Sequence, residues 1–157
     1  MNALLHLRRA GVADMAAVTA LQAAAYAANR QALGVEPLPL LADYADVFCH
    51  CEVWLAEEPH GLLGVLIVRP RTDDLLLWSV ATAPHAQRQG IGNRLLAAAE
   101  ARAREHGVSC IRLYTGEKLS NNIAWYQRHG YVRTRSEEIG DRRLVHLVKY
   151  LHDVVRP

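Results

Sequence analysis

The stretch Gln87–Gly107, "QRQGIGNRLLAAAEARAREHG", reads as an amphipathic helix with an unusual beginning. Its apolar residues recur at helical spacing, at Ile91, Leu95, Ala98, Ala99 and Ala103. Basic residues near its end suit the helix dipole, and Gly107 is a typical helix stop. Gly90 and Gly92, however, stand where a serine, threonine or aspartate would normally cap the first turn. The stretch therefore predicts a helix whose first turn is left uncapped.

An uncapped helix start has a specific physical property. Its first backbone N–H groups have no partner within the helix, and they carry the positive end of the helix dipole. Glycines at this point let a ligand approach the backbone closely. Together these features favour an anion site, best suited to phosphate. On these residues alone, a second interpretation stays open, in which the glycines only shape the turn from strand to helix.

Two well-known phosphate loops do not match this stretch. The Walker A pattern ends in Gly-Lys-Ser/Thr, and "QRQGIGNRLL" contains no lysine. The dinucleotide pattern needs a third glycine, and Leu95 stands in its place. The chain also lacks the second strand–helix–strand unit that a doubly wound sheet requires.

The rest of the chain predicts an α/β fold around one mixed sheet. We expect strands over 4–9, 51–58, 62–70, 75–82, 108–115, 131–138 and 142–151, and helices over 12–30, 41–48, within 87–107 and over 120–129. The order is β-α-α-β-β-β-α-β-α-β-β, with strands 75–82 and 108–115 parallel across a crossover helix. Strand 75–82, "LLLWSVAT", has almost no polar residue, so we expect it to be buried on both faces.

Composition narrows the class of protein. The chain of 157 residues is the size of one domain, so we expect residues 1–157 to form a single domain. Apolar residues make up 51% and charged residues 22%, which indicates a folded globular protein. The formal charge of +2 is too small to favour nucleic acid or a membrane as the main partner.

Location and metal content are also predicted from the sequence. The amino-terminal apolar run is short and is ended by Arg8 and Arg9, unlike a signal peptide, and no segment approaches the roughly 20 apolar residues of a membrane span. We therefore expect a cytoplasmic protein.

Cys49, Cys51 and Cys110 lack a second ligand pair at zinc spacing, which favours reduced thiols and no metal site.

Two motifs together resemble a known family. Residues 87–92, "QRQGIG", resemble the Q/R-x-x-G-x-G/A motif of the GNAT acetyltransferase superfamily, whose loop holds the pyrophosphate of coenzyme A. As in that family, the motif follows a strand and opens an amphipathic helix. "NNIAWYQRHGY" resembles the second signature, Asn-x-x-x-Tyr-x-x-x-Gly-Tyr/Phe, through Asn122, Tyr126, Gly130 and Tyr131. The order of elements agrees with the GNAT-like fold along nearly all of the chain.

The resemblance implies a set of residues that contact acetyl-CoA. They are Val80, Thr82, Gln87, Arg88, Gln89, Gly90, Ile91, Gly92, Asn122 and Tyr126. Backbone N–H groups of 88–92 would cradle the pyrophosphate, the backbone around Val80 and Thr82 would bind the pantetheine arm and acetyl carbonyl, and Tyr126 would face the sulfur. Arg88 is a departure, because many members have glycine there, so its side chain must point away from the loop or toward a phosphate.

Acetyl transfer from a thioester to an amine needs an oxyanion donor, a proton for the thiolate and a neutral amine. A backbone N–H near Thr82, exposed by a bulge, would serve the oxyanion. Tyr126 would protonate the thiolate as general acid, since a phenol and a thiol have reference pKa values of about 10 and 8.5. Tyr126 also fits an ordinary core aromatic on its helix, and that interpretation stays open.

The general base has several candidates. Strand 75–82 carries no carboxylate. The candidates are Glu52, Asp73, Asp74 and His85. Groups of these types are usually solvated at the surface, so a water molecule or a backbone carbonyl remains an alternative.

The resemblance implies an acetyl-CoA-dependent N-acetyltransferase in which a primary amine attacks the thioester directly. We expect this amine to belong to a small molecule. The acceptor would enter between the first two helices and the last hairpin, where Tyr26, Tyr44, Trp54 and Trp78 are candidates to hold a cationic amine. These residues also fit plain core. We expect a monomer or homodimer without metal. A non-catalytic acyl-CoA-binding regulatory module and a nucleotide-binding regulatory domain remain alternatives.

Overall fold

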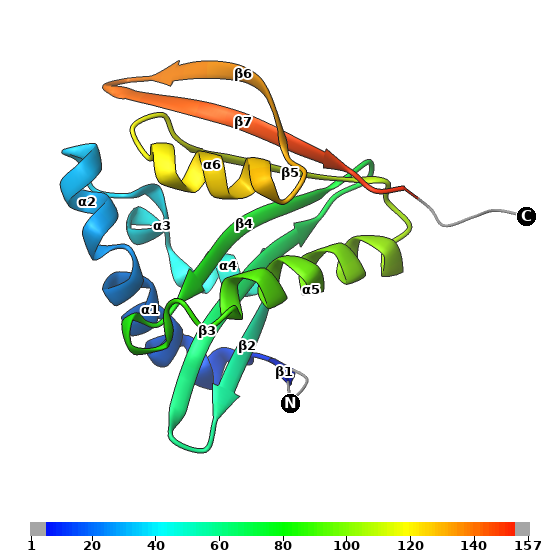
Figure 1. Ribbon diagram of the computed structural model, residues 1–157. Helices are drawn as coiled ribbons and strands as arrows, with labels where there is room; N and C mark the ends of the chain where they lie inside the picture. Colours follow the sequence, from blue (N-terminus) through cyan, green and yellow to red (C-terminus); the bar gives the residue numbers. More distant parts are fainter. Residues whose placement is uncertain (1–5, 153–157) are drawn as a thin grey trace, which may run out of the picture.

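A computed structural model of the protein describes residues 6–152 and contains one seven-stranded mixed sheet (Figure 1). Its strands are β1 (Leu7–Arg9), β2 (Glu52–Glu58), β3 (Gly61–Pro70), β4 (Leu75–Thr82), β5 (Cys110–Gly116), β6 (Val132–Ile139) and β7 (Arg142–Tyr150). The helices are α1 (Met15–Ala25), α2 (Ala27–Leu33), α3 (Leu38–Leu41), α4 (Tyr44–His50), α5 (Ile91–Glu105) and α6 (Ser120–Arg128), with single 3-10 turns at Val12–Asp14 and Pro84–Ala86. The strand order is β1-β2-β3-β4-β5-β7-β6.

The predicted fold class and element order are confirmed, including the parallel pairing of β4 with β5. The helix expected over 12–30 is divided at Tyr26, where the backbone leaves helical geometry. No glycine or proline marks this break in the sequence. The Tyr26 hydroxyl shares a hydrogen bond of 2.8 Å with Ser79 of β4, so a tertiary contact holds the side chain at the break. Residues 4 and 5 of the first expected strand lie outside the described residues.

Helix α5 packs on β3 and β4 from one face of the sheet, and α1 and α4 pack from the other (Figure 1). Its buried residues are Ile91, Leu95, Leu96, Ala99 and Ala103, close to the predicted stripe. Gly64 of β3 permits this approach, because a Cβ at this position would lie only 3.0 Å from Leu95 Cδ1 and from the Ala81 carbonyl oxygen. Within residues 6–152, no helix has the length and apolar character needed to cross a membrane.

Strands β4 and β5 separate soon after they meet. Their pairing is limited to Leu75 with Ile111 and Leu76 with Arg112. On its other side, β4 pairs with β3 along its whole length, and β5 likewise pairs with β7. The two halves of the sheet are therefore each intact, and a gap opens between them toward the carboxyl ends of both strands.

The expectation that β4 is buried on both faces is wrong, because β4 separates from β5. Its burial alternates instead, with Leu75, Leu77, Ser79 and Ala81 buried and the residues between them half-exposed. A β-bulge adds to the irregularity, since Ile67 pairs with Ser79 and Val68 with Leu77, which leaves Trp78 as an extra residue. The apolar character of "LLLWSVAT" thus reflects a strand that lines a cleft as well as a core.

Candidate active site

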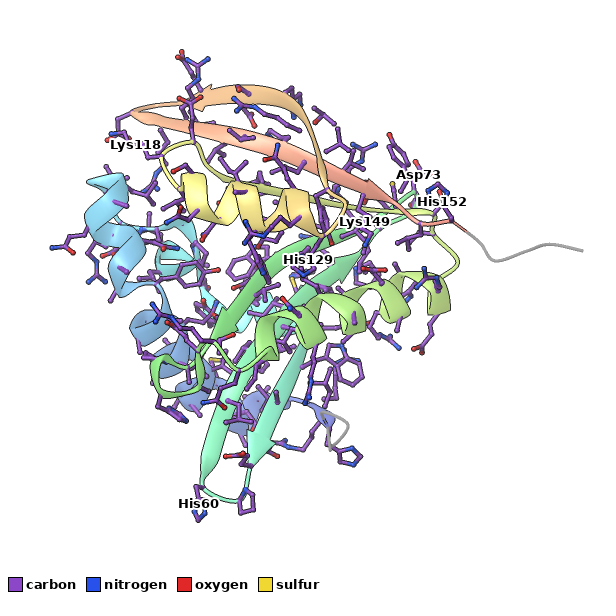
Figure 2. All side chains as sticks on the ribbon, in the orientation of Figure 1. His60, Asp73, Lys118, His129, Lys149 and His152 are labelled. Atoms are coloured by element: carbon purple, nitrogen blue, oxygen red, sulfur yellow. The ribbon has the colours of Figure 1, made fainter. Side chains whose placement is uncertain are left out.

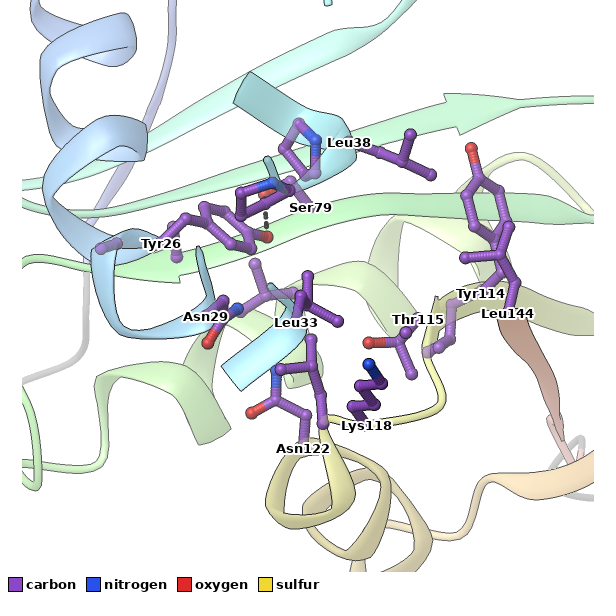
Figure 3. A pocket seen from close by; sticks show the side chains of 18 of the residues that line it. Tyr26, Asn29, Leu33, Leu38, Ser79, Tyr114, Thr115, Lys118, Asn122 and Leu144 are labelled. Carbon is purple, nitrogen blue, oxygen red and sulfur yellow. Dashed lines mark hydrogen bonds between the residues drawn. The ribbon is translucent and has the colours of Figure 1, made fainter. Parts of the chain in front are cut away.

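A cleft with a volume of about 630 Å³ lies where β4 and β5 separate (Figure 3). The ends of the two strands form its floor, and α6 forms one wall. The segment from α2 into α3 forms another wall, and the turn between β6 and β7 lies at the mouth. Five separate parts of the sequence therefore meet around one space.

A second, smaller cavity opens at the start of α5. It is lined by Thr82, Gln87, Arg88, Gly90, Ile91, Gly92, Asn93 and Trp125. The first bond of the α5 ladder runs from the Arg94 N–H to the Gly90 carbonyl, at 3.2 Å. The N–H groups of residues 91–93 precede that bond, so they are free to serve a ligand at the positive end of the helix. The cavity has the chemistry of an anion site, and it shares Thr82, Gln87, Gly92 and Trp125 with the larger cleft.

The backbone of this loop takes an uncommon conformation at two residues. Gly90 has a φ of +80° and Arg88 a φ of +67°. Glycine adopts this region without strain, whereas an arginine there costs about 1 kcal/mol. The conformation accounts for the glycine that many members of the resembled family have at the position of Arg88. The arginine keeps the fold of the loop and lines the anion cavity.

Gly92 has a packing role that the sequence did not reveal. A Cβ at this position would lie 3.1 Å from Cζ2 of Trp125 on α6. The Trp125 indole N–H also donates a hydrogen bond of 3.2 Å to the Asn93 side chain. These two contacts hold α6 against the first turn of α5. Trp125 was missed from the sequence, although it adjoins Tyr126 in the second motif.

Tyr126 lines the large cleft from α6, as does Asn122 one turn earlier. Its ring lies 5.6 Å from that of Tyr131 and 5.0 Å from that of Trp125, measured between centroids. Burial raises the pKa of the Tyr126 hydroxyl well above its ordinary value, and the nearby Tyr26 and Tyr131 add to the rise. The hydroxyl is therefore protonated throughout the physiological range and can act as a donor.

The expected bulge is present in β4 but not near Thr82. It lies at Trp78, whereas Val80 and Thr82 keep regular register with Leu66 and Gly64 of β3. Val80 and Thr82 both line the cleft. Because β5 has already separated from β4 at this point, the edge of β4 that faces the cleft is open without a bulge.

None of the four candidate bases lines the cleft. Glu52 lies between β2 and α5, within 2.9 Å of Arg102 and 2.8 Å of His106. Burial alone would raise the pKa of Glu52, but hydrogen bonds from Arg102, Trp54 and His106 lower it to about 2. A carboxylate held in this way is a structural ion-pair partner and a poor base.

The other three candidates also lie elsewhere. Asp74 is paired with Arg71 at 2.5 Å and Arg112 at 3.2 Å. Asp73 precedes β4, and Figure 2 shows it at the end of the molecule opposite Lys118. His85 is exposed in the turn before α5. The carboxylates that do line the cleft are those of Glu117 and Asp141, which no sequence motif indicated because each lies in a connecting turn.

Two of the four predicted acceptor-site aromatics, Tyr26 and Trp78, line the cleft. Burial raises the pKa of Tyr26 to about 12, although its hydrogen bond with Ser79 acts in the opposite direction. Tyr44 lies outside the lining, where its ring meets Trp78 edge-on at 6.0 Å. Trp54 lies away from the cleft, between the guanidinium groups of Arg9 and Arg102 at 5.5 and 5.2 Å.

Comparison with known proteins identifies the family. A sequence model of the acetyltransferase (GNAT) domain matches residues 49–133, more than half of the chain. The chain belongs to the GNAT acetyltransferase family. The GNAT resemblance predicted from the two motifs is thus confirmed, and the protein is an acetyl-CoA-dependent N-acetyltransferase.

Solved GNAT structures share the fold at low identity. The PaiA N-acetyltransferase of Thermoplasma acidophilum in complex with coenzyme A has a TM-score of 0.76 at 15% identity, over 96% of this chain and 99% of that one. A GNAT acetyltransferase of Elizabethkingia anophelis with acetyl-CoA bound has a TM-score of 0.67 at 16% identity, over 96% and 100%. A ribosomal-protein-alanine N-acetyltransferase of Brucella melitensis has a TM-score of 0.70 at 23% identity, over 94% and 100%. At such identities the likeness shows the common fold and leaves the acceptor open.

Among residues 6–152, no group of three or more histidine, cysteine, aspartate or glutamate side chains is arranged to hold a metal ion. The three cysteines are free thiols, with Cys49 exposed and Cys110 buried.

Proposed function

We propose that this GNAT enzyme transfers the acetyl group of acetyl-CoA to a primary amine of a small molecule by direct attack, and that residues 1–157 form one domain. The observation that carries the proposal is the separation of β4 from β5 after two paired positions. It opens a cleft that is continuous with the anion cavity at α5 and that has Tyr126 on its wall.

The coenzyme fits this pair of cavities. In our proposal, backbone N–H groups from Arg88 to Gly92 bind the pyrophosphate at the positive end of α5. Two side chains brace the loop, because the Gln87 amide approaches the Thr82 carbonyl and the Gln89 amide approaches the His85 carbonyl, each at 3.5 Å. The pantetheine arm then follows the open edge of β4 at Val80 and Thr82, with Asn122 on the opposite wall.

The thioester supplies an electrophilic carbonyl carbon, which a neutral amine nitrogen attacks as the carbon–sulfur bond breaks. Tyr126 then donates a hydrogen bond to the sulfur as negative charge develops there. Because the pKa of Tyr126 is well above the reference value of about 8.5 for a thiol, complete proton transfer to sulfur is unfavourable. Tyr126 therefore stabilises the departing thiolate mainly as a donor, and water completes its protonation.

The proton of the attacking amine leaves through water in this proposal. Glu117, one of the two carboxylates in the cleft, is held in an ion pair 2.8 Å from Arg143. Asp141 is exposed in the turn between β6 and β7.

The size of the cleft favours a small acceptor. Pockets for small molecules commonly have volumes of 300–1,000 Å³, and this one, at about 630 Å³, also has to accept the pantetheine arm. The segment from α2 into α3 narrows the side from which the acceptor would enter (Figure 3). A folded protein surface would reach the thioester only by extending a chain end into this space.

A thiol-release assay tests the proposal. The enzyme is given acetyl-CoA with a panel of small primary amines and with peptides that begin with alanine, and coenzyme A release is followed against a control without amine. We expect release with at least one small amine, at a kcat/KM at least about tenfold above the peptides, a difference of 1.4 kcal/mol. Release with peptides alone would contradict a small acceptor, and no release with any amine would contradict the proposed activity.

A further inference from the structure

The acceptor end of the cleft is lined by five charged side chains. The cations are Lys118, Arg142 and Arg143, and the anions are Glu117 and Asp141. Glu117 and Lys118 lie in the loop between β5 and α6, Asp141 lies in the turn between β6 and β7, and the two arginines begin β7. Cations therefore outnumber anions where the second substrate enters.

One cation and one anion neutralise each other. The Arg143 guanidinium lies 2.8 Å from the Glu117 carboxylate and 3.2 Å from that of Glu138. Glu117 also has Arg133 at 3.7 Å. This group of four charges is balanced within itself and has little tendency to recruit a charged ligand.

Arg142 is different, because the group to which it donates a hydrogen bond is uncharged. Its Nη2 donates a hydrogen bond to the main-chain carbonyl of Glu36, which fixes the guanidinium beside the α2–α3 wall. The Glu36 carboxylate is paired instead with Arg30, at 2.6 Å. In the described part of the chain, Arg142 has no carboxylate within ion-pair distance. A half-buried guanidinium thus keeps its charge and most of its N–H donors for a ligand.

Lys118 adds a second such charge. Its side chain extends from the β5–α6 loop toward Thr115, on the side of the cleft where Leu33 also lies (Figure 3). Over residues 6–152 no ion pair involves Lys118. The exposed carboxylate of Asp141 opposes one of these two charges, so the acceptor end retains an excess of positive charge.

We propose that the acceptor is an amino acid, in which a carboxylate accompanies the amine, and that Arg142 and Lys118 bind this carboxylate. The proposal rests on the proposed acetyl transfer and names its substrate class. A planar guanidinium matches a carboxylate through two parallel N–H···O bonds, and a lysine adds a point charge. The apolar wall formed by Leu33, Leu38 and Leu144 favours an apolar side chain on the acceptor.

The same charges also act on the amine of the acceptor. Neighbouring cations favour the uncharged form of an amine. The neutral amine that attacks the thioester therefore forms more readily beside Arg142 and Lys118 than in water.

Matched acceptors test the carboxylate. L-leucine and L-phenylalanine are compared with isoamylamine and phenethylamine, which lack only the carboxylate, and with the corresponding aminoalkyl phosphonates. We expect kcat/KM for each amino acid to exceed that of its matched amine at least about tenfold, a difference of 1.4 kcal/mol. Equal or greater activity with the amines would overturn the proposal, and a preference for the phosphonates would assign the site to phosphate-like groups instead.

Matched variants test the residues. We expect Arg142→Gln and Lys118→Gln each to lower kcat/KM for the amino acids about tenfold or more, with little change for the amines and with the KM for acetyl-CoA unchanged. Arg135→Gln is the control, because it removes one exposed positive charge of β6 that does not line the cleft. A raised KM for acetyl-CoA in both cleft variants would assign the two cations to the coenzyme and overturn the proposal.

Two further variants and the pattern of thiol release distinguish a failure of this inference from a failure of the proposed function. Lys118 is exposed, so Lys118→Gln is informative even if Arg142→Gln unfolds through loss of its bond to Glu36. Arg142→Lys keeps the charge and loses the planar fork, and we expect it to restore part of the selectivity. Thiol release with amines but without carboxylate selectivity would overturn this inference alone, whereas no release with any amine would overturn the proposed function.

Discussion

Tyr126 lines the large cleft, and its pKa is raised by burial and by two neighbouring tyrosines. A hydroxyl with such a pKa stays protonated across the pH range in which enzymes are assayed. Its contribution is therefore made as a neutral donor to the departing sulfur.

Tyr126→Phe removes the hydroxyl and keeps the ring that packs against Tyr131 and Trp125. We expect the single-turnover rate to fall by about 10²–10³-fold, the usual contribution of one preorganised hydrogen-bond donor, with little change in coenzyme affinity. We also expect no loss of the parent's rate near pH 10 from ionisation of this tyrosine, because its pKa lies above the ordinary value. Parental single-turnover rates in the variant would remove Tyr126 from the chemistry.

At the residue scale, the sequence indicated where a cavity lies but did not indicate how the residues around it pack. "QRQGIG" gave the position of the anion cavity, since a motif of this kind depends on local backbone geometry. It did not predict that Gly92 also makes room for the ring of Trp125, which comes from another helix. For this reason a carboxylate introduced at Gly92 would disturb the packing of α6 as well as the anion site.

At the scale of elements, a partly buried cluster of charged side chains connects β2 with the end of α5. Glu52 of β2 is bonded to Arg102 and His106 at the end of α5, and Trp54 lies against the Arg102 guanidinium. The pKa of Glu52 is lowered from 4.5 to about 2. Stability gained in this way is fully present above pH 4.5 and is lost as the pH falls through the folded value near 2.

Glu52→Gln removes the charge and leaves Arg102 without its main partner. We expect a loss of about 3 kcal/mol in the free energy of unfolding at pH 7, as for other broken buried ion pairs. Between pH 4.5 and 2 the parent should lose its advantage over the variant, which urea denaturation at several pH values would measure.

Glu105→Gln is the matched control. Its carboxylate pairs with the same Arg102 at 2.8 Å but is 62% exposed, so we expect a loss below about 1 kcal/mol. Equal losses from the two variants, or a difference between parent and Glu52→Gln that does not change with pH, would contradict the assignment of the cluster.

Hydrophobic periodicity predicted a helix or strand correctly where the spacing of apolar residues is regular. Helix α5 has a clear apolar stripe, and the structure buries nearly all of it. The break at Tyr26 was not predictable, because it occurs in an alanine-rich stretch and is associated with the bond to Ser79, 53 residues away. The half-exposure of β4 was also missed, because a run of apolar residues does not reveal which neighbouring strand leaves the sheet.

At the scale of the whole molecule, the coenzyme and acceptor ends of the cleft differed in how far the sequence predicted them. The end that we propose for the coenzyme lies near two motifs that are short and local. The acceptor end is assembled from 29–39, 113–119 and 141–144, segments that only the strand order brings together. Lys118 lies in a connecting loop and Arg142 at the first position of β7, and no pattern in the sequence distinguishes their charges from those of ordinary surface residues.

The central claim is that coenzyme A binds the cleft with its pyrophosphate on the glycine loop of α5. Gly90 offers the most direct test, because its φ is +80° and a Cβ there meets no atom within 4 Å. Asparagine and aspartate both tolerate this backbone region and have the same size, so Gly90→Asn and Gly90→Asp differ in charge alone.

Calorimetric titration of the parent and both variants with coenzyme A makes the comparison, with melting curves to confirm that the two variants are equally folded. We expect Gly90→Asn to bind no more tightly than the parent, because it adds a side chain to the loop, and Gly90→Asp to bind at least about tenfold more weakly than Gly90→Asn, because its carboxylate repels the pyrophosphate. Equal affinity in Gly90→Asp and Gly90→Asn, or a parent that does not bind coenzyme A, would contradict the account.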